Sequence, residues 1–393
     1  MTDEDRRNDW PMTTSIYTES ERVIRDTFRR FTEEQVKPRA EAIDQAKEFP
    51  RELFQQVGAL GLFGMRYPAK WGGTDTGTQS YLLAIEELAK GSLSLAACCT
   101  MQSLMGTYFI FRSGDDDVCR RFLVPAIKGE KVGTICITEP DAGSDLDAIS
   151  TRAVEDKDGW VLNGAKTWIT SAPAADFFTV FAVTKMGERP RDKELSVFLV
   201  EKGTEGLTVG KTIEKMGLWG SVTSEVTFDD CHIPAGNLLG ECGKGRAYLR
   251  EILARIRLTT AALALGAGEV AVADAIQYAG ERVQFGKPIA KNQAIKVQLA
   301  DRATELEAAR HLTAHAAWRE DQGLPNMKEA SMAKLFASES ALSACDTAAR
   351  VLGAYGFAME YPVQRYLRDV RFTLIGGGTS EILKLIIAKE IGL

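Results

Sequence analysis

Hydrophobic positions along the chain change their spacing twice. From Tyr17 to about residue 131, apolar residues recur three and four positions apart, as in "IYTESERVIRDTFRRFTEEQVKPRAEAI", which predicts amphipathic helices. From about residue 132 to 240, short β-branched and aromatic runs such as "VGTICITEP" and "FFTVFAVTK" are separated by turn clusters such as "DKDG", which predicts a small antiparallel β-domain. From about residue 241, helical spacing returns and holds to Leu393.

This pattern predicts an α+β, mostly α fold with three domains. We expect a flexible N-terminus at residues 1–16, an all-α domain at 17–131, a middle β-domain at 132–240 and a C-terminal helical bundle at 241–393. The first residues, "MTDEDRRNDWPMTTS", contain no apolar segment of the kind found in signal peptides, so secretion is not expected. A run of 18 or more apolar residues is absent, so no membrane span is expected.

Composition and charge exclude some partners. The chain has 393 residues, of which 45% are hydrophobic and 26% charged, an ordinary globular composition. Its net charge is -6 and its Lys and Arg residues are spread along the chain, so binding of nucleic acid is not expected. The seven cysteines form no CxxC pair, which favours reduced thiols and a cytoplasmic location.

Two motifs that can mark ligand sites are better explained as parts of helices. The stretch "GAGEVA" from Gly266 to Ala271 matches a dinucleotide-binding pattern, but it lies in an Ala-rich helical segment with no strand before it. Small residues spaced in this way favour close helix packing. "HLTAH" places His311 and His315 one helical turn apart without a third ligand, so we predict no metal site. His232 is the only other histidine.

Two stretches in the predicted β-domain carry residues suited to a planar polar ligand. "ITEPDAGSD" is a turn at a strand end with the hydroxyls of Thr138 and Ser144. "NGAKTWITSAP" puts Trp168 and Thr170 on the same face of a strand. Taken singly, each stretch is equally compatible with an ordinary turn or a core tryptophan.

Two further stretches lie in the C-terminal region. In "YAGERVQFGKPIAKNQ", Arg282 can pair with a phosphate and Phe285 can cover an apolar edge, although a simple helix C-cap also fits. "LIGGGTSEI" places three glycines before a last helix, where Gly costs about 0.5–1 kcal/mol per residue relative to Ala. The free N–H groups from Thr379 to Glu381 begin that helix and suit a pyrophosphate.

These four stretches, in this order and over nearly the whole chain from Tyr17, resemble the acyl-CoA dehydrogenase family. The resemblance implies a helical domain, a β-barrel-like middle domain and a C-terminal four-helix bundle, assembled as a homotetramer or dimer. It implies an FAD-dependent oxidoreductase of carboxylic acid catabolism that acts on an acyl-CoA thioester. FAD would be bound without covalent attachment, and the electrons would pass to an electron-transfer flavoprotein or a similar acceptor.

The resemblance also implies which residues bind the cofactor and the substrate. The flavin ring would meet Ile135, Ile137, Thr138, Trp168 and Thr170. The pyrophosphate and adenosine would be held by Arg282, Gln284, Phe285 and Gln293 of a neighbouring subunit, with Arg350 and Gly353 of "RVLGAYG" on the adenine side. Thr379 and Glu381 would contact the ribityl-phosphate side, and Ser144, Arg257 and Gly377 would lie along the flavin and the acyl-CoA.

The resemblance leaves the catalytic base unassigned. Most family members carry a Glu in the loop that here reads "GGG", at the position of Gly377. A second branch, which includes the isovaleryl and long-chain enzymes, takes its Glu from the residue before an Arg in a long helix. The residues at those two positions here are Ile256 and Arg257. A carboxylate is therefore missing from both known base positions.

Three explanations stay open at this point. The first is a dehydrogenase with a relocated base, for which Glu251 and Glu87 are candidates and Cys98 and Cys99 line the acyl pocket in relatives. The second is a flavoenzyme that needs no α-proton base, as in desulfination, enoyl-CoA reduction or oxygenation, with Gly377 leaving room for a bulky or branched substrate. The third is a non-catalytic partner of an active paralogue. A glutaryl-type activity is disfavoured, because Ala96 stands where those enzymes carry an Arg.

Overall fold

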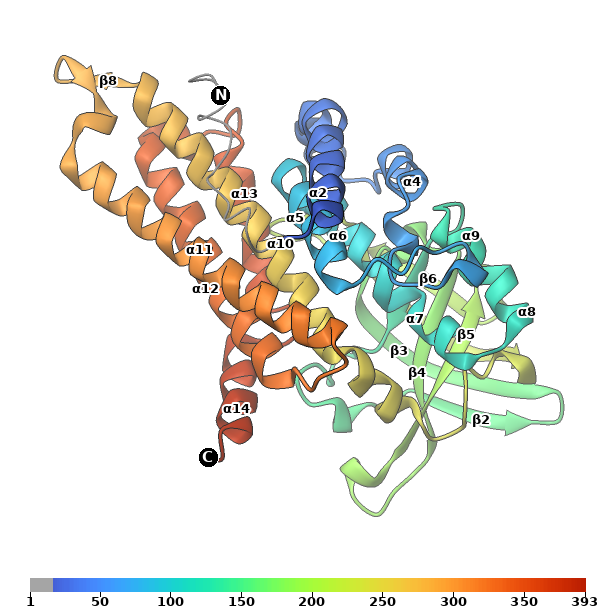
Figure 1. The fold of residues 1–393 in the computed structure, drawn as a ribbon. Helices are drawn as coiled ribbons and strands as arrows, with labels where there is room; N and C mark the ends of the chain where they lie inside the picture. Colours follow the sequence, from blue (N-terminus) through green and yellow to red (C-terminus); the bar gives the residue numbers. More distant parts are fainter. Residues whose placement is uncertain (1–16) are drawn as a thin grey trace.

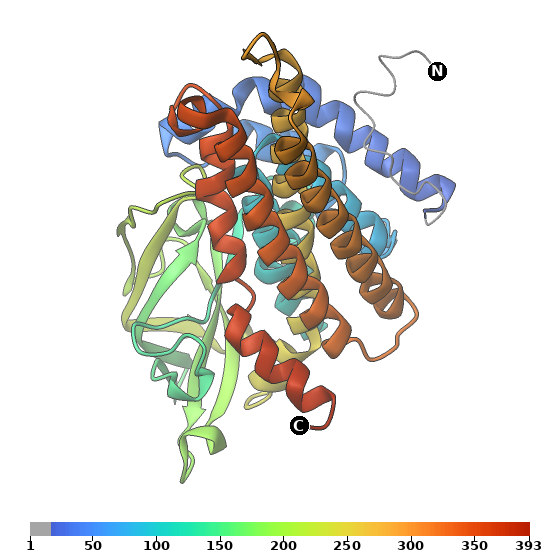
Figure 2. The same ribbon diagram turned by 90° about the vertical axis from the view of Figure 1, so that its left-hand side faces the viewer.

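The computed structural model describes residues 17–393, so the segment 1–16 predicted to be flexible lies outside the described residues. A curled β-sheet forms one side of the molecule and a bundle of long helices forms the other, as Figure 1 shows. The N-terminal helices lie between them. Figure 2, turned by 90°, shows the long helices side by side with the sheet on their flank.

The N-terminal helices form the middle layer. The first of them begins at a capping box, in which the Thr18 backbone N–H donates to Glu21 Oε2 at 2.7 Å while the Thr18 hydroxyl accepts from the Glu21 backbone N–H. The fourth and fifth are buried along nearly their whole length because they face other layers on both sides. The helices are α2 (Glu19–Phe31), α3 (Ala40–Ala46), α4 (Arg51–Ala59), α5 (Thr78–Gly91), α6 (Leu93–Thr100), α7 (Tyr108–Ser113), α8 (Asp116–Val118) and α9 (Val124–Ile127).

The middle domain is a seven-stranded sheet in the order β1-β4-β2-β3-β7-β6, with β5 paired to β4. Most pairs are antiparallel, as predicted, but β1 and β2 each run parallel to β4. The sheet is therefore mixed. The β2–β3 hairpin lies between β1 and β4 in the sequence and reverses the chain, so β4 runs in the same direction as β1. The strands are β1 (Gly133–Cys136), β2 (Arg152–Asp156), β3 (Gly159–Thr170), β4 (Phe177–Lys185), β5 (Glu194–Glu201), β6 (Leu207–Thr212) and β7 (Thr223–Pro234).

The C-terminal domain is built on three long helices, and two shorter ones pack against the third of them. The first long helix runs for 37 residues and also packs against α5. A two-stranded hairpin joins it to the second. The elements are α10 (Gly245–Glu281), β8 (Val283–Gln284), β9 (Lys287–Pro288), α11 (Gln293–Asp321), α12 (Met327–Leu352), α13 (Val363–Val370) and α14 (Ser380–Glu390).

Two helical segments within residues 17–393, Leu93–Ser113 and Gly245–Glu281, are long and apolar enough to cross a membrane by length and composition alone. Their most apolar windows are 94% and 89% buried inside the fold. Core helices pass the same test, and here the apolar surface is already covered by protein.

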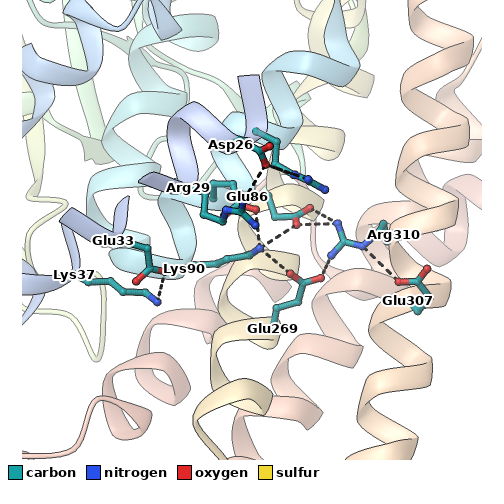
Figure 3. Close-up of polar contacts among 11 residues, drawn as sticks. Asp26, Arg29, Glu33, Lys37, Glu86, Lys90, Glu269, Glu307 and Arg310 are labelled. Carbon is teal, nitrogen blue, oxygen red and sulfur yellow. Dashed lines mark hydrogen bonds and ion pairs between the residues drawn. The ribbon is translucent and has the colours of Figure 1, made fainter. Parts of the chain in front are cut away.

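Charged side chains of α5, α10 and α11 form a buried network where these helices meet (Figure 3). The Arg310 guanidinium donates to Glu86 Oε1 at 2.8 Å and also contacts Glu269. Lys90 joins the network at 3.1 Å from Glu269 and 2.8 Å from Glu87. Burial alone would lower the pKa of Arg310, but Glu86 and its hydrogen bond more than reverse this and raise it. The network thus joins the N-terminal layer to the bundle through compensated charges.

The stretch "GAGEVA" lies within α10, as predicted, and serves close helix packing. A Cβ at Gly266 would lie 2.4 Å from the Glu86 backbone oxygen of α5, and one at Gly268 would lie 2.7 Å from Leu306 of α11. His311 and His315 lie on α11, and no cluster of three or more His, Cys, Asp or Glu within the described chain is arranged to hold a metal ion.

Replacing Gly266 with Val should destabilise the protein by at least about 1–3 kcal/mol, because the larger side chain forces α10 away from α5. Gly280 in the same helix is a matched control, since a Cβ there meets no atom within 4 Å. Gly280→Ala should instead stabilise the helix by about 0.5–1 kcal/mol. Thermal unfolding of both variants checks the prediction, and equal changes of the same sign would contradict it.

Candidate active site

The two strands with the predicted flavin-ring residues are held next to each other. The Thr167 backbone N–H donates to the Thr138 carbonyl at 2.9 Å, and the Thr134 hydroxyl donates to the Thr170 carbonyl at 2.6 Å. A buried lysine, Lys166, adds a bond from its Nζ to the Ile137 carbonyl at 3.1 Å. The structure therefore brings the end of β1 and the end of β3 together, as the proposed ring site requires.

Glu139 fixes the turn that carries Ser144. Its Oε1 pairs with Lys166 Nζ at 2.8 Å, and its Oε2 accepts from the Ser150 backbone N–H at 2.7 Å. Burial would raise the pKa of Glu139, but the Lys166 charge and three hydrogen-bonding partners lower it to about 2. The carboxylate is thus permanently ionised and structural, and it leaves Ser144 exposed at the tip of the turn.

Trp168 is an exposed aromatic residue near the end of β3. It is 57% exposed, while its neighbour Ile169 is 2% exposed. Its backbone φ of 58° lies in the left-handed region, which bulky residues rarely adopt and which is typical of ligand-binding sites. An exposed aromatic ring on a strained backbone beside Thr170 fits a planar apolar ring such as a flavin.

Each glycine of "GGG" has a structural reason. A Cβ at Gly376 would lie 2.5 Å from the Phe372 ring, while Gly377 and Gly378 have φ angles of 74° and 108°. After them Thr379 caps α14, its hydroxyl accepting from the Ile382 backbone N–H at 3.3 Å. The predicted helix start at this point is confirmed, and Glu381 is exposed in its first turn.

The two positions at which the family resemblance predicts a catalytic base meet in this fold. The three atoms nearest to a Cβ built on Gly377 are Thr260 Oγ1 at 3.0 Å, Ile256 Cγ2 at 3.5 Å and the Ile256 carbonyl oxygen at 3.8 Å. None of them is a carboxylate. Ile256 and Ile137 pack against the same hydrophobic cluster, which contains Ile135. Ile256 of α10 therefore lies against Gly377 of the glycine loop, so both positions predicted for the base share one place in the fold. An apolar side chain occupies that place, next to the strand with the predicted flavin residues.

The other acids and thiols weighed as relocated bases have structural partners. Glu251 accepts from the Tyr108 hydroxyl at 2.5 Å and pairs with Arg112 at 2.9 Å. Glu87 is buried and pairs with Lys90 at 2.8 Å. Burial raises the pKa of the Cys98 thiol to about 11 and that of Cys99 well above its usual value, so neither is a thiolate at neutral pH.

Two buried cations lie beside the glycine loop. Lys334 Nζ of α12 donates to the Gly378 carbonyl at 2.7 Å. The Arg257 guanidinium donates to Ser331 Oγ at 3.0 Å and contacts Met327, and its Nε is buried without a partner. Burial lowers the pKa of Arg257 to about 10 and that of Lys334 to about 8. Lys334 is not among the residues predicted from the sequence, although a lysine in the apolar run "SMAKLFAS" is a signal of a buried charge.

The predicted pyrophosphate and adenosine residues lie elsewhere, on the hairpin that projects from the end of the bundle (Figure 1). Phe285 at its tip is 98% exposed with a φ of 52°. Arg282 and Gln284 are exposed on the same hairpin, and Gln293 begins α11. From Ile256 to the end of α10 the helix rises about 38 Å, so one chain presents these residues far from its own glycine loop.

The residues of "RVLGAYG" lie next to this hairpin. The Arg282 guanidinium lies 5.6 Å from the ring centroid of Tyr355, two residues after Gly353. Arg350 is exposed and pairs with Asp346 at 2.8 Å. The structure thus divides the predicted cofactor residues into two groups, one around β1, β3 and the glycine loop, the other at the far end of the bundle.

Comparison with protein families identifies the class of protein. The acyl-CoA dehydrogenase N-terminal domain matches residues 18–130, the middle domain matches 134–231 and the C-terminal domain matches 243–392. The chain belongs to the acyl-CoA dehydrogenase family. It is an FAD-dependent oxidoreductase that acts on the CH–CH group of CoA thioesters.

Individual members of the family show high similarity to this chain over nearly its whole length. The chain is 56% identical over 375 residues to a benzylmalonyl-CoA dehydrogenase of Aromatoleum aromaticum, covering 95% of this chain and 98% of the relative. It is 39% identical over 376 residues to an acryloyl-CoA reductase (NADH) of Anaerotignum propionicum, covering 95% of each. The butyryl-CoA dehydrogenase structure from Megasphaera elsdenii superimposes with a TM-score of 0.91 at 36% identity, covering 95% of this chain and 98% of that one.

Proposed function

We propose that this protein oxidises a CoA thioester that carries a carboxylate on its α-carbon, and that loss of CO₂ replaces removal of an α-proton. The observation that carries this proposal is the Ile256–Gly377 contact, where both family base positions converge without a carboxylate. A general base must lie within hydrogen-bond reach of the proton it removes. A substrate that loses CO₂ has no need of one.

Oxidative decarboxylation of such a thioester needs a two-electron oxidant but no protein base. The bond between the α-carbon and the carboxylate carbon breaks, CO₂ leaves, and the electron pair of that bond becomes the double bond between the α- and β-carbons. Bound FAD supplies the oxidant, because it accepts the β-hydrogen as a hydride with two electrons. The products are an enoyl-CoA and CO₂, and no protein group has to accept a proton from carbon.

The chain's own residues would hold the cofactor in two half-sites. Exposed Trp168 and the neighbouring Thr170 and Thr138 suit the flavin ring, and exposed Phe285 and Arg282 suit the adenosine end of a second copy's cofactor. The length of α10 supports this division, because it separates the hairpin from the glycine loop of the same chain. The hairpin residues would then contact the cofactor of another subunit. We infer a homo-oligomer, dimer or tetramer, located in the cytoplasm, with an electron-transfer flavoprotein as the acceptor.

The substrate named for the relative at 56% identity belongs to the proposed class. Benzylmalonyl-CoA, named in the relative at 56% identity, has a benzyl group and a carboxylate on the α-carbon of its thioester. We infer that the absence of a side chain at Gly377 lets the enzyme accept a branched substrate of this kind. Reduction of an enoyl-CoA, named in a relative at 39% identity, has less support. Its last step delivers a proton to the α-carbon, and the position for that acid is occupied by Ile256.

The test is to incubate the purified, FAD-loaded protein with 2-benzylmalonyl-CoA under anaerobic conditions with an artificial electron acceptor. We expect equal amounts of CO₂ and enoyl-CoA. The matched control is 3-phenylpropanoyl-CoA, the same thioester without its carboxylate, which should react at least about 100-fold more slowly because it needs a general base. Comparable turnover of both thioesters would overturn the proposal.

A further inference from the structure

Two cations beside the glycine loop lack the counter-ion that buried charges normally have. Arg257 is 4% exposed and Lys334 is fully buried. Among residues 17–393, Arg257 bonds to Ser331 and Lys334 to a backbone carbonyl, and neither forms an ion pair with a carboxylate. Buried Arg and Lys side chains are rarely unpaired because removing a charge from water is costly. By contrast, the buried guanidinium of Arg310 in the same bundle pairs with Glu86 at 2.8 Å.

The contacts of both cations place them close to Ile256 and Gly377, the two positions predicted for the base. Lys334 Nζ bonds the carbonyl of Gly378, the residue after Gly377. Arg257 follows Ile256 in α10, and both cations lie along one face of α12, since Ser331 precedes Lys334 by three residues. The Nε of Arg257 is buried with an unused hydrogen. A carboxylate brought to this point would find an N–H donor and two positive charges.

We propose that Arg257 and Lys334 form the binding site for the α-carboxylate of the substrate, so that the substrate itself supplies the negative charge that this chain lacks. This inference rests on the function proposed above. It names the groups that select an α-carboxyacyl-CoA over a simple acyl-CoA. The pair also orients the substrate, because fixing the carboxylate fixes which bonds of the α-carbon face the flavin strand.

The test compares malonyl-CoA with acetyl-CoA, which differ only in the α-carboxylate. Malonyl-CoA has no β-hydrogen to lose as a hydride, so its binding can be measured by calorimetry on the FAD-loaded enzyme. Since hydrogen bonds to charged groups are strong, we expect malonyl-CoA to bind the wild type about 10- to 100-fold more tightly than acetyl-CoA. In Arg257→Met and Lys334→Met this preference for malonyl-CoA over acetyl-CoA should fall by about tenfold or more.

Further variants separate recognition from folding. Arg257→Lys keeps the charge and should keep most of the preference, whereas a purely structural defect would weaken both thioesters equally. Arg189→Met removes an exposed arginine that pairs with Asp192 at 2.7 Å, outside both groups of predicted site residues, and should leave the preference unchanged. An unchanged preference in both Met variants would overturn the assignment of the site. That outcome together with decarboxylation of 2-benzylmalonyl-CoA would leave the proposed function standing, and the reverse pair of results would leave only the binding site.

The preference should also depend on pH. Burial lowers the pKa of Lys334 to about 8, with Arg257 lowering it further and the carboxylates of Glu339 and Glu381 opposing the shift. The lysine is therefore a cation at pH 7 and loses its proton above about pH 8, so the dissociation constant of malonyl-CoA should rise up to about tenfold between about pH 7.5 and 9. Acetyl-CoA should show no matching rise. Parallel pH profiles for the two thioesters would exclude Lys334 as a carboxylate ligand.

Discussion

Ile256→Glu is expected to turn this protein into a conventional acyl-CoA dehydrogenase. The variant should oxidise 3-phenylpropanoyl-CoA about 10²- to 10⁴-fold faster than the wild type, the usual contribution of a positioned general base. The side chain at position 256 already reaches the site, since Ile256 Cγ2 lies 3.5 Å from a Cβ built on Gly377. The buried cations nearby would hold the new carboxylate ionised.

The helix is a better place for the new base than the loop. Gly377 has a φ of 74°, a conformation that costs an L-residue about 1–2 kcal/mol, and a Cβ there would lie 3.0 Å from Thr260 Oγ1. Position 256 lies in the regular helix α10 and already carries a branched side chain. Gly377→Glu should therefore give a smaller gain than Ile256→Glu.

Flavin bleaching and enoyl-CoA formation under anaerobic conditions measure the gain. Ile256→Gln has nearly the same shape without a base and should stay as inactive as the wild type with 3-phenylpropanoyl-CoA. The new Glu competes with the substrate carboxylate for the cations, so Ile256→Glu should also bind malonyl-CoA less tightly. A folded, FAD-loaded Ile256→Glu protein without any gain would show that more than a base is missing.

Arg310→Met is expected to destabilise the protein by about 3–5 kcal/mol, the usual cost of leaving a buried charge without its partner. The substitution leaves Glu86 and Glu269 buried, at 4% and 6% exposure, and within the described chain Lys90 is then the cation seen paired with both (Figure 3). Because these residues join α5, α10 and α11, loss of the network should loosen the contact between the N-terminal layer and the bundle.

Thermal and urea unfolding of the FAD-loaded protein measure this effect. The exposed pair of Arg189 and Asp192, 2.7 Å apart, provides the control, and Arg189→Met should change stability by at most about 1 kcal/mol. Adding Glu86→Gln and Glu269→Gln to Arg310→Met should recover part of the loss, because the unpaired charges disappear. If Arg310→Met costs no more than Arg189→Met, the network contributes no net stability.

The sequence by itself determined the order of helical and strand-rich regions and the family. Periodicity reports which face of an element is buried, so it predicted the helix containing "GAGEVA" and the last helix after Gly378. It did not predict that β1 runs parallel to β4, because strand direction depends on which strands become neighbours.

Only the tertiary structure decided how distant residues meet. It placed Ile256 against Gly377, 121 positions apart in the sequence, and joined the ends of β1 and β3. It also brought Arg257 of α10 and Lys334 of α12 to the same part of the fold, where within residues 17–393 neither forms an ion pair with a carboxylate, and no local pattern encodes such a meeting. Local propensities set each element, whereas burial and charge compensation depend on which elements pack together.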